Sequence, residues 1–294
     1  MDDVPRTDDV PRTAEDYGPE DLRQVKAGCL EVATRLGDLL DDLVIVGGLV
    51  PPLLVDLAQE EGPGGTDPLS RHVGTQDLDL GFAIGLVDEG RYAEVSTRLA
   101  RFSFSPDRNE KGNPTPQRWR HENASELTID FLISPTGEEE EGGSIKHLEE
   151  NLAAIVVPGL DLAFEDACEV ELSGTRLDGA EATQEIPVCG PGAFVLLKAL
   201  ACQQRGKDKD KYDLFYVIRN YREGPSAVAD HFRPFLTAGR SEAQEALKTL
   251  SEYFDDPRSI GPVAVSQFVY GEPNDALQAD AVAFAGEFLA QLRD

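Results

Sequence analysis

Hydrophobic and polar positions along the chain follow two different periods, which predicts a fold that mixes helices and strands. Apolar residues recur at roughly helical spacing over residues 19–40, and the apolar run at 43–46 is typical of a short buried strand. Polar and apolar residues then alternate over 77–83, which predicts a strand with Leu78, Leu80 and Phe82 on its core face. We expect a helix over 88–101, antiparallel strands over 102–105, 117–122 and 126–133, and further strands over 154–157, 160–164, 169–172 and 185–188.

After Pro191 the pattern becomes helical. Helices are expected over residues 192–204, 211–221, 226–233, 241–255 and 274–293. The third is expected to stop before Pro234, because proline lacks the N–H that a helix interior requires. The predicted organisation is a disordered acidic tail over 1–18, in which Asp-Asp-Val-Pro-Arg-Thr occurs twice, a mixed domain over 19–190 and a helical region over 191–294.

Three aspartates in the strand segments predict a shared acidic site. Asp77 and Asp79 are two residues apart in one strand and therefore point to the same face. Asp130 lies in the apolar segment over 127–133, and an adjacent strand would bring it to the same place. Clustered carboxylates repel one another unless cations occupy the cluster. Two Mg²⁺ ions between such carboxylates and a nucleoside triphosphate are a common arrangement for phosphoryl chemistry. Exposure of Asp77 and Asp79 to solvent, and burial of Asp130 with hydrogen-bond donors, are the alternatives.

A glycine pair follows the strand at 43–46. Gly47 and Gly48 are expected to open a helix that runs to about residue 59, with Pro51 and Pro52 in its first turn. A glycine turn between a strand and a helix lets backbone N–H groups approach a phosphate closely. A simple turn is the alternative interpretation.

A lysine in an apolar helix forms a further candidate site. Lys198 is surrounded in sequence by apolar residues, which is unusual for a charged side chain unless it meets an anion such as a triphosphate. Asp210 and Asp213 are three residues apart and can share one helix face near Lys198. An exposed lysine and a helix-capping acidic cluster are the alternatives.

A basic and aromatic stretch contrasts with the acidic chain. Its members are Arg101, Arg108, Lys111, Arg118, Trp119, Arg120 and His121. Such side chains can guide RNA phosphates or stack on a base, but an exposed hairpin that balances nearby acids is the simpler interpretation. His72, just before the aspartate strand, could contact a substrate or a phosphate, but an ordinary loop histidine is the simpler interpretation.

Charge and composition limit the partners and the cellular location that we expect for this protein. The net charge is −28, which argues against nonspecific nucleic-acid binding. No apolar run approaches the ~20 residues of a membrane span, and the acidic N-terminus lacks a signal-peptide pattern, so a cytoplasmic protein with no membrane partner is expected. The four cysteines are widely spaced and are interpreted as free thiols.

Taken together, the motifs resemble those of the AbiEii/AbiGii toxin family, within the DNA polymerase β-like nucleotidyltransferase superfamily. The matching residues are Gly47-Gly48, Thr75-x-Asp77-x-Asp79-Leu80, Ile129-Asp130, Lys198 and Lys209-Asp210-x-x-Asp213-Leu214. The resemblance covers roughly residues 40–220. It implies an α+β fold, with a mixed sheet flanked by helices and a helical C-terminal region. Leu49 stands where the family has a serine-type residue.

The resemblance also implies an activity. It implies transfer of a nucleoside monophosphate from a triphosphate to a hydroxyl, with two Mg²⁺ ions held by Asp77, Asp79 and Asp130. Gly47, Gly48, Thr75 and Lys198 would contact the triphosphate, and Asp210 or Asp213 would support the site.

The acceptor and the partners also follow from the resemblance. Family members act as toxins in toxin–antitoxin or phage-defence pairs, and some modify tRNA ends, so RNA and a cognate antitoxin are the implied partners. Two alternatives stay open: a small-molecule acceptor of the aminoglycoside type, which suits an acidic surface, and a degenerate fold that acts as a binding module.

Overall fold

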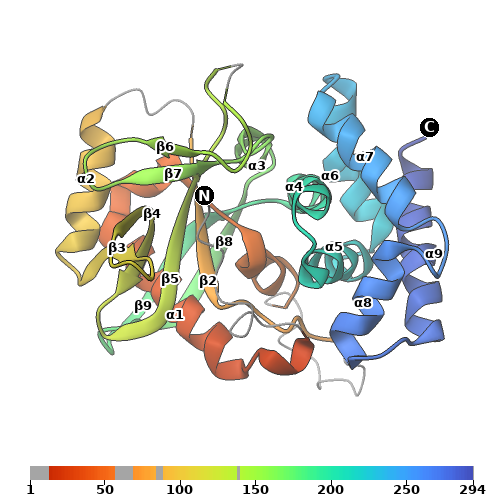
Figure 1. Cartoon of the computed structure of the whole chain (residues 1–294), viewed down its shortest axis with the longest axis horizontal. Helices are drawn as coiled ribbons and strands as arrows, with labels where there is room; N and C mark the ends of the chain where they lie inside the picture. The colour runs from red at the N-terminus through yellow and green to blue at the C-terminus, as the bar shows by residue number, and fades with distance from the viewer. Residues whose placement is uncertain (1–12, 57–68, 84–88, 138–139, 294) are drawn as a thin grey trace. The chain divides into compact units, whose positions relative to one another are not determined.

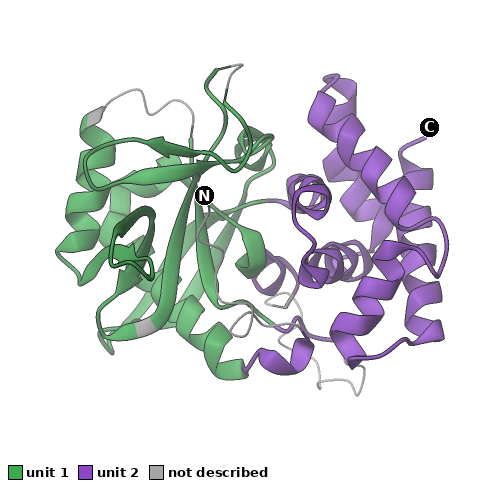
Figure 2. Cartoon of the chain, viewed as in Figure 1, with its two compact units in different colours: residues 1–3, 19–49, 74–189 green, residues 4–18, 50–73, 190–294 purple. Residues whose placement is uncertain are grey.

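The computed structural model describes residues 13–56, 69–83, 89–137 and 140–293 of the 294-residue chain (Figure 1). The tail segment over 1–12, the glycine-rich segment over 62–65 and residues 138–139 of the acidic run lie outside the described residues. The chain forms two compact units (Figure 2). In the described residues, the first unit comprises residues 19–49, 74–83, 89–137 and 140–189, and the second comprises 13–18, 50–56, 69–73 and 190–293.

A single mixed β-sheet forms the framework of the first unit. Its described strands are β1 (Leu43–Val46), β2 (Asp77–Phe82), β3 (Phe104–Arg108), β4 (Pro114–His121), β5 (Ala124–Ile133), β6 (Ile145–His147), β7 (Ala153–Val156), β8 (Cys168–Thr175) and β9 (Glu181–Val188). The order across the sheet is β3-β4-β5-β2-β1-β9-β8, and β7 pairs with the end of β5 and with β6. β2 runs parallel to β5, whereas β3, β4 and β5 are antiparallel, as the alternation predicted for these three. The long-range pairing places β2 and β5 at the centre of the sheet.

Helices pack on the apolar face of this sheet. α1 (Pro19–Leu36) and α2 (Glu89–Ala100) both lie along it, and the rings of Phe82 and Tyr92 are 5.3 Å apart where β2 meets α2 (Figure 1). Leu78, Leu80 and Phe82 are fully buried, because strand alternation directs all three side chains to this face. The predicted core face of this strand is therefore confirmed.

The prediction of a strand over 160–164 was wrong. This segment forms a short helix, α3 (Asp161–Glu165), in which Leu162 and Ala163 are buried. Five residues are too few for periodicity to distinguish one helical turn from a strand. Leu160, just before α3, packs beside Gly81 and so covers one end of the sheet face opposite α1. The short strand β6 was not predicted.

The second unit is helical in its C-terminal part. Its longer described helices are α4 (Pro191–Gln204), α5 (Asp208–Asn220), α6 (Pro225–Thr237), α7 (Ser241–Tyr253), α8 (Ile260–Tyr270) and α9 (Asp275–Gln291). α4 is the most enclosed of them and contacts α5, α6 and α7. The rings of Phe232 and Phe288 meet edge to face at 5.6 Å where α6 packs on α9.

One prediction in this unit was wrong, and one helix was not predicted. α6 does not end before Pro234 but continues to Thr237. Pro234 is exposed, whereas Phe232 and Phe235 are buried, so the missing N–H falls on the solvent side, where water can bond the freed carbonyl. α8 was not predicted, because its apolar residues show no clear helical period.

The segment after the glycine pair also differs from its prediction. Gly47–Leu49 forms a 3-10 turn, and Pro52–Asp56 forms a short π-helix instead of an α-helix. Residues 57–59 lie outside the described part of the chain.

The four cysteines are free thiols, as predicted. Among the described helices, none combines the length and the apolar character that crossing a bilayer requires.

Candidate active site

Strand pairing in the first unit places two of the three predicted aspartates side by side. Asp79 of β2 lies directly opposite Asp130 of the parallel strand β5. Val46 of β1 lies opposite Asp79 on the other side, and Arg118 of β4 lies opposite Asp130. Residues that face each other in neighbouring strands point to the same face of the sheet. Asp79, Asp130 and Arg118 therefore form one row across β2, β5 and β4.

A second polar row runs parallel to the first, two residues away along each strand. Asp77 lies opposite Thr128, and Thr128 lies opposite Arg120. The Thr128 hydroxyl donates a hydrogen bond to Asp77 Oδ1. Arg120 forms an ion pair with Asp107 at 3.1 Å. The two rows make a continuous polar patch, which we call the aspartate face and define as Asp77, Asp79, Asp130, Thr128 and Arg118.

Asp130 is held by a bidentate contact with Arg118. Arg118 Nε donates to Asp130 Oδ1 at 2.6 Å, and Nη2 donates to Oδ2 at 2.5 Å. The Asp130 side chain is only 10% exposed, whereas that of Arg118 is 39% exposed. The hydrogen bonds to Asp130 raise the pKa of Arg118, and the charges of Asp77 and Asp79 raise it further. The enclosed Asp130 carboxylate thus accepts hydrogen bonds from Arg118. Burial of Asp130 with hydrogen-bond donors was the alternative interpretation of its apolar sequence surroundings.

Gly47 is required by the position of Asp79. Its φ of +70° is a left-handed conformation that favours glycine. A Cβ atom at this position would overlap Asp79 Oδ2 and lie 2.7 Å from the carboxylate carbon. The antiparallel pairing of β1 with β2 brings this turn beside Asp79. The Asp79 carboxylate therefore packs directly against the Gly47 backbone, in the space that the side chain of any other residue at position 47 would occupy.

The other residues of this region have local roles. Thr75 lies just before β2, where its hydroxyl donates to the Asp77 carbonyl at 3.3 Å. Gly48 is buried in the 3-10 turn. From the basic and aromatic stretch, Trp119 and His121 are buried, so they do not present rings for stacking on a base. The simpler interpretation of this stretch fits better, since Arg118 and Arg120 balance nearby acids.

The donors on the aspartate face are oxygens, the ligand type that Mg²⁺ prefers. The described residues contain no group of three or more His, Cys, Asp or Glu side chains close enough to hold a metal ion. Arg118 instead binds both oxygens of Asp130. With three carboxylates and one guanidinium, the face carries a formal charge of −2, which matches one divalent cation. Asp77 and Asp79 present oxygen ligands on one strand face, whereas both oxygens of Asp130 are bound by Arg118.

Lys198, Asp210 and Asp213 come together in the second unit. Lys198 Nζ lies 2.8 Å from Asp210 Oδ1 and 2.7 Å from Asp213 Oδ2. The i, i+3 spacing on α5 directs both carboxylates to the lysine of α4, as the sequence predicted. All three side chains are at most 8% exposed. Lys198 is thus neutralised by two aspartates, and its contact with a phosphate stays a prediction.

Further charged groups complete this network. Lys209 Nζ and His72 Nε2 approach Asp213 Oδ1 at 2.7 and 2.8 Å. Arg205 Nε donates to Asp210 Oδ2 at 2.8 Å. The interpretation of His72 as an ordinary loop residue was wrong, because its ring is fully buried and stacks on Tyr212. Of these contacts, the sequence indicated only the one between Lys209 and Asp213, through their i, i+4 spacing on a helix.

The pKa values in the network follow from burial and from the ion pairs. Burial lowers the pKa of His72 to about 4, although Asp213 opposes the shift. Burial alone would raise the pKa of Asp210, but Lys198 and Arg205 outweigh it and hold the pKa at about 2. Burial also works against the charged form of Lys198, and the two aspartates raise its pKa despite this. At neutral pH Lys198, Asp210 and Asp213 are therefore charged and His72 is neutral.

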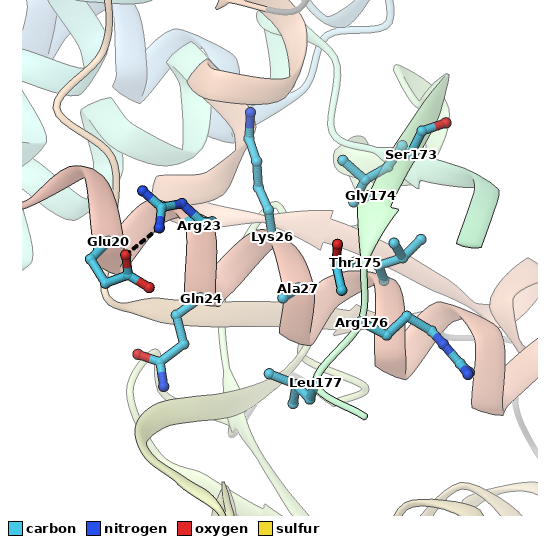
Figure 3. Close-up of a pocket in the computed structure, with 12 residues that line it drawn as sticks. Glu20, Arg23, Gln24, Lys26, Ala27, Ser173, Gly174, Thr175, Arg176 and Leu177 are labelled. Atoms are coloured by element: carbon cyan, nitrogen blue, oxygen red, sulfur yellow. Dashed lines mark hydrogen bonds and ion pairs between the residues drawn. The ribbon is translucent and has the colours of Figure 1, made fainter. Parts of the chain in front are cut away.

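A separate pocket lies between α1 and β8 in the first unit, and its volume is about 450 Å³ (Figure 3). Leu30 and Leu172 give it an apolar floor, and it contains none of the predicted site residues. The side chains of Arg23, Lys26 and Arg176 point in different directions around it (Figure 3). Because its charged groups do not converge, the pocket does not form an obvious anion site.

The aspartate face is therefore the strongest candidate for chemistry in the described chain. It brings together carboxylates from two strands, a glycine turn and a guanidinium. Comparison with protein-family models and with curated proteins gives no match for this chain. The functional assignment consequently depends on the residues and the geometry of the site itself.

Proposed function

We propose that this protein is a Mg²⁺-dependent nucleotidyltransferase and that the aspartate face is its catalytic site. The observation that carries the proposal is the row formed by Asp79 and Asp130 beside the Gly47 turn. Two carboxylates from neighbouring strands, with Asp77 two residues away, supply the oxygen ligands that phosphoryl transfer requires. The mixed sheet with flanking helices is compatible with the nucleotidyltransferase fold that the motifs imply.

The reaction would transfer a nucleoside monophosphate to an acceptor hydroxyl. A new bond forms between the acceptor oxygen and the α-phosphorus, the bond to the bridging oxygen breaks, and pyrophosphate leaves. Bound Mg²⁺ would neutralise the phosphate charge and orient the reacting groups. Asp77 and Asp79 would hold the ions. Asp130, once released by Arg118, would complete the carboxylate set and accept the proton of the acceptor hydroxyl.

The biological role that we propose is that of a toxin in a toxin–antitoxin or phage-defence pair. The motif resemblance supports it, and it implies a cognate antitoxin and an RNA acceptor such as tRNA. The net charge of −28 instead favours a cationic small molecule, because a long polyanion would be repelled. The acceptor is therefore the part of the proposal that most needs an experiment.

A second candidate function is supported by the Arg118 contact. A guanidinium bound to both oxygens of Asp130 removes that carboxylate from a metal site. Leu49 after the glycine pair is a second departure from the family pattern. Both features fit a degenerate nucleotidyltransferase fold that binds a partner without catalysis.

Labelled-nucleotide transfer distinguishes the candidates. The protein is incubated with each labelled triphosphate and Mg²⁺, in separate reactions with total RNA, total protein and aminoglycosides. Asp79→Asn should reduce transfer at least about 100-fold. Asp178→Asn is the matched control, since this exposed aspartate of the same unit pairs with Arg35 and Arg176 away from the aspartate face. Equal transfer by the two variants would refute a catalytic role for Asp79, and absence of transfer by the wild type to any acceptor would favour the binding module.

A further inference from the structure

The position of Arg118 suggests a role that differs from the usual surface ion pair. Surface arginines contribute little when both partners are exposed. Here the carboxylate is 90% buried from solvent and the guanidinium is bidentate, which is the strong form of this contact. Removing a partner would leave Asp130 as an enclosed charge without its strongest donor. The bidentate contact therefore places a positive charge directly beside Asp130.

The surroundings of Arg118 show which other cation can take its place. Asp79 is the direct neighbour of Asp130 on the opposite side, and Asp77 lies two residues before Asp79 on the same face of β2. A divalent cation beside Asp79 and Asp130 would meet the guanidinium of Arg118 at the same carboxylate oxygens. The guanidinium already binds both oxygens of Asp130, so a metal ion there would compete with it for the same oxygens and be repelled by its charge. The guanidinium is 39% exposed, so its side chain has a path away from the sheet.

We infer that Arg118 is the resident counter-cation of Asp130 and that a divalent cation completes its site only by displacing Arg118. This inference rests on the proposed function only in that it takes the aspartate face as the metal site. Arg118 is thus a positioning residue that sets the affinity for the metal. In the metal-free protein it also holds the Asp130 carboxylate by both oxygens.

A metal titration tests the inference directly. The full chain is titrated calorimetrically with Mn²⁺ in the absence of nucleotide, as wild type, Arg118→Ala and Arg120→Ala. Arg120 is the matched control because it lies two residues away on the same face of β4 and binds Asp107 instead. Both variants remove one positive charge and one ion pair, and they differ in which carboxylate loses its partner, Asp130 or Asp107.

We expect the two substitutions to change the affinity for Mn²⁺ by different amounts. Arg118→Ala should bind Mn²⁺ about 10-fold to about 100-fold more tightly than the wild type, because the competing charged hydrogen bonds are absent. Arg120→Ala should stay within about threefold of the wild type, since screening weakens a charge that makes no direct contact. Equal affinities of the two variants, weaker binding by Arg118→Ala, or no Mn²⁺ binding by any of the three proteins would each overturn the inference.

A second measurement uses the wild type and so does not depend on the stability of Arg118→Ala. Arginine labelled with ¹⁵N gives an Nε–H signal for Arg118, which Arg118→Lys identifies by its loss. Saturating Mg²⁺ should move this signal to the position of a solvated arginine, and an unchanged signal would contradict displacement. Neither measurement uses a triphosphate. Tighter metal binding without nucleotide transfer would therefore refute the proposed function alone, and transfer with unchanged metal binding would refute this inference alone.

Discussion

The carboxylate of Asp79 occupies the space in which a side chain at position 47 would begin. Gly47 also has a φ of +70°, so its backbone conformation and its missing side chain are both required. The reason is the antiparallel pairing of β1 and β2, which places the turn after Val46 next to Asp79. The glycine motif therefore has a structural role in positioning Asp79, whatever it also contributes to phosphate binding.

Gly47→Ala should disturb Asp79 as well as the backbone. We expect a loss of stability clearly above the roughly 1–2 kcal/mol of a left-handed alanine, together with weaker Mn²⁺ binding. Gly112→Ala is the control, since Gly112 has a φ of +79° and no atom within 4 Å of an added Cβ. Urea unfolding and metal titration of both variants provide the comparison. Equal losses would show that Asp79 moves aside without consequence.

Asp213 should be essential for the stability of the second unit. Asp213→Asn removes the charge that pairs with Lys198 and Lys209 in a buried network, so we expect a loss of about 3–5 kcal/mol in the free energy of unfolding. Asp230→Asn breaks an exposed pair with Arg233 on α6 and should cost at most about 1 kcal/mol. Urea unfolding at pH 7 measures both. A difference below about 1 kcal/mol would mean that the network contributes no more than a surface pair.

His72 should make stability depend on pH. Its pKa is about 4 in the folded protein, below its ordinary value near 6.5, because the ring is buried. As the pH falls from about 6.5 to about 4, the unfolded chain binds a proton at His72 and the folded protein does not. The free energy of unfolding should therefore decrease by on the order of 3 kcal/mol over this window.

The variant His72→Gln isolates this effect. It keeps a donor for Asp213 and cannot titrate, so its stability should fall less steeply between pH 6.5 and pH 4. Burial also lowers the pKa of His121, but that contribution is common to both proteins. Urea unfolding at several pH values gives the two curves, and parallel curves would contradict the assignment to His72.

Gly192 should be intolerant of a side chain. A Cβ at this position would lie 2.5 Å from the His231 carbonyl carbon, where α4 meets the backbone of α6. Because a backbone cannot yield as a flexible side chain does, Gly192→Ala should destabilise by about 1–3 kcal/mol. Gly286→Ala in α9 meets no atom within 4 Å and should instead stabilise by about 1 kcal/mol. Thermal unfolding of the two variants tests this, and a stabilised Gly192→Ala would show that the helices separate easily.

The local pattern of the sequence was sufficient for most of the elements. Alternation identified β2 and its core face, and helical spacing identified α1, α2 and most helices of the second unit. The local pattern failed for one segment that was too short and for one proline whose effect depends on solvent exposure. The five residues of α3 are too short to show a period, and Pro234 is tolerated because its missing hydrogen bond faces solvent.

The sequence by itself determined which residue types are present and which of them share a strand face, because side-chain direction in a strand depends only on the parity of the position. It thus placed Asp77 beside Asp79 and kept Leu78 apart from them. Only the tertiary structure decided their partners. Strand register set Asp79 against Asp130 and Asp130 against Arg118, and folding brought His72 to Asp213, which is 141 residues away in sequence. Such contacts depend on register and packing across the whole chain, which no local pattern contains.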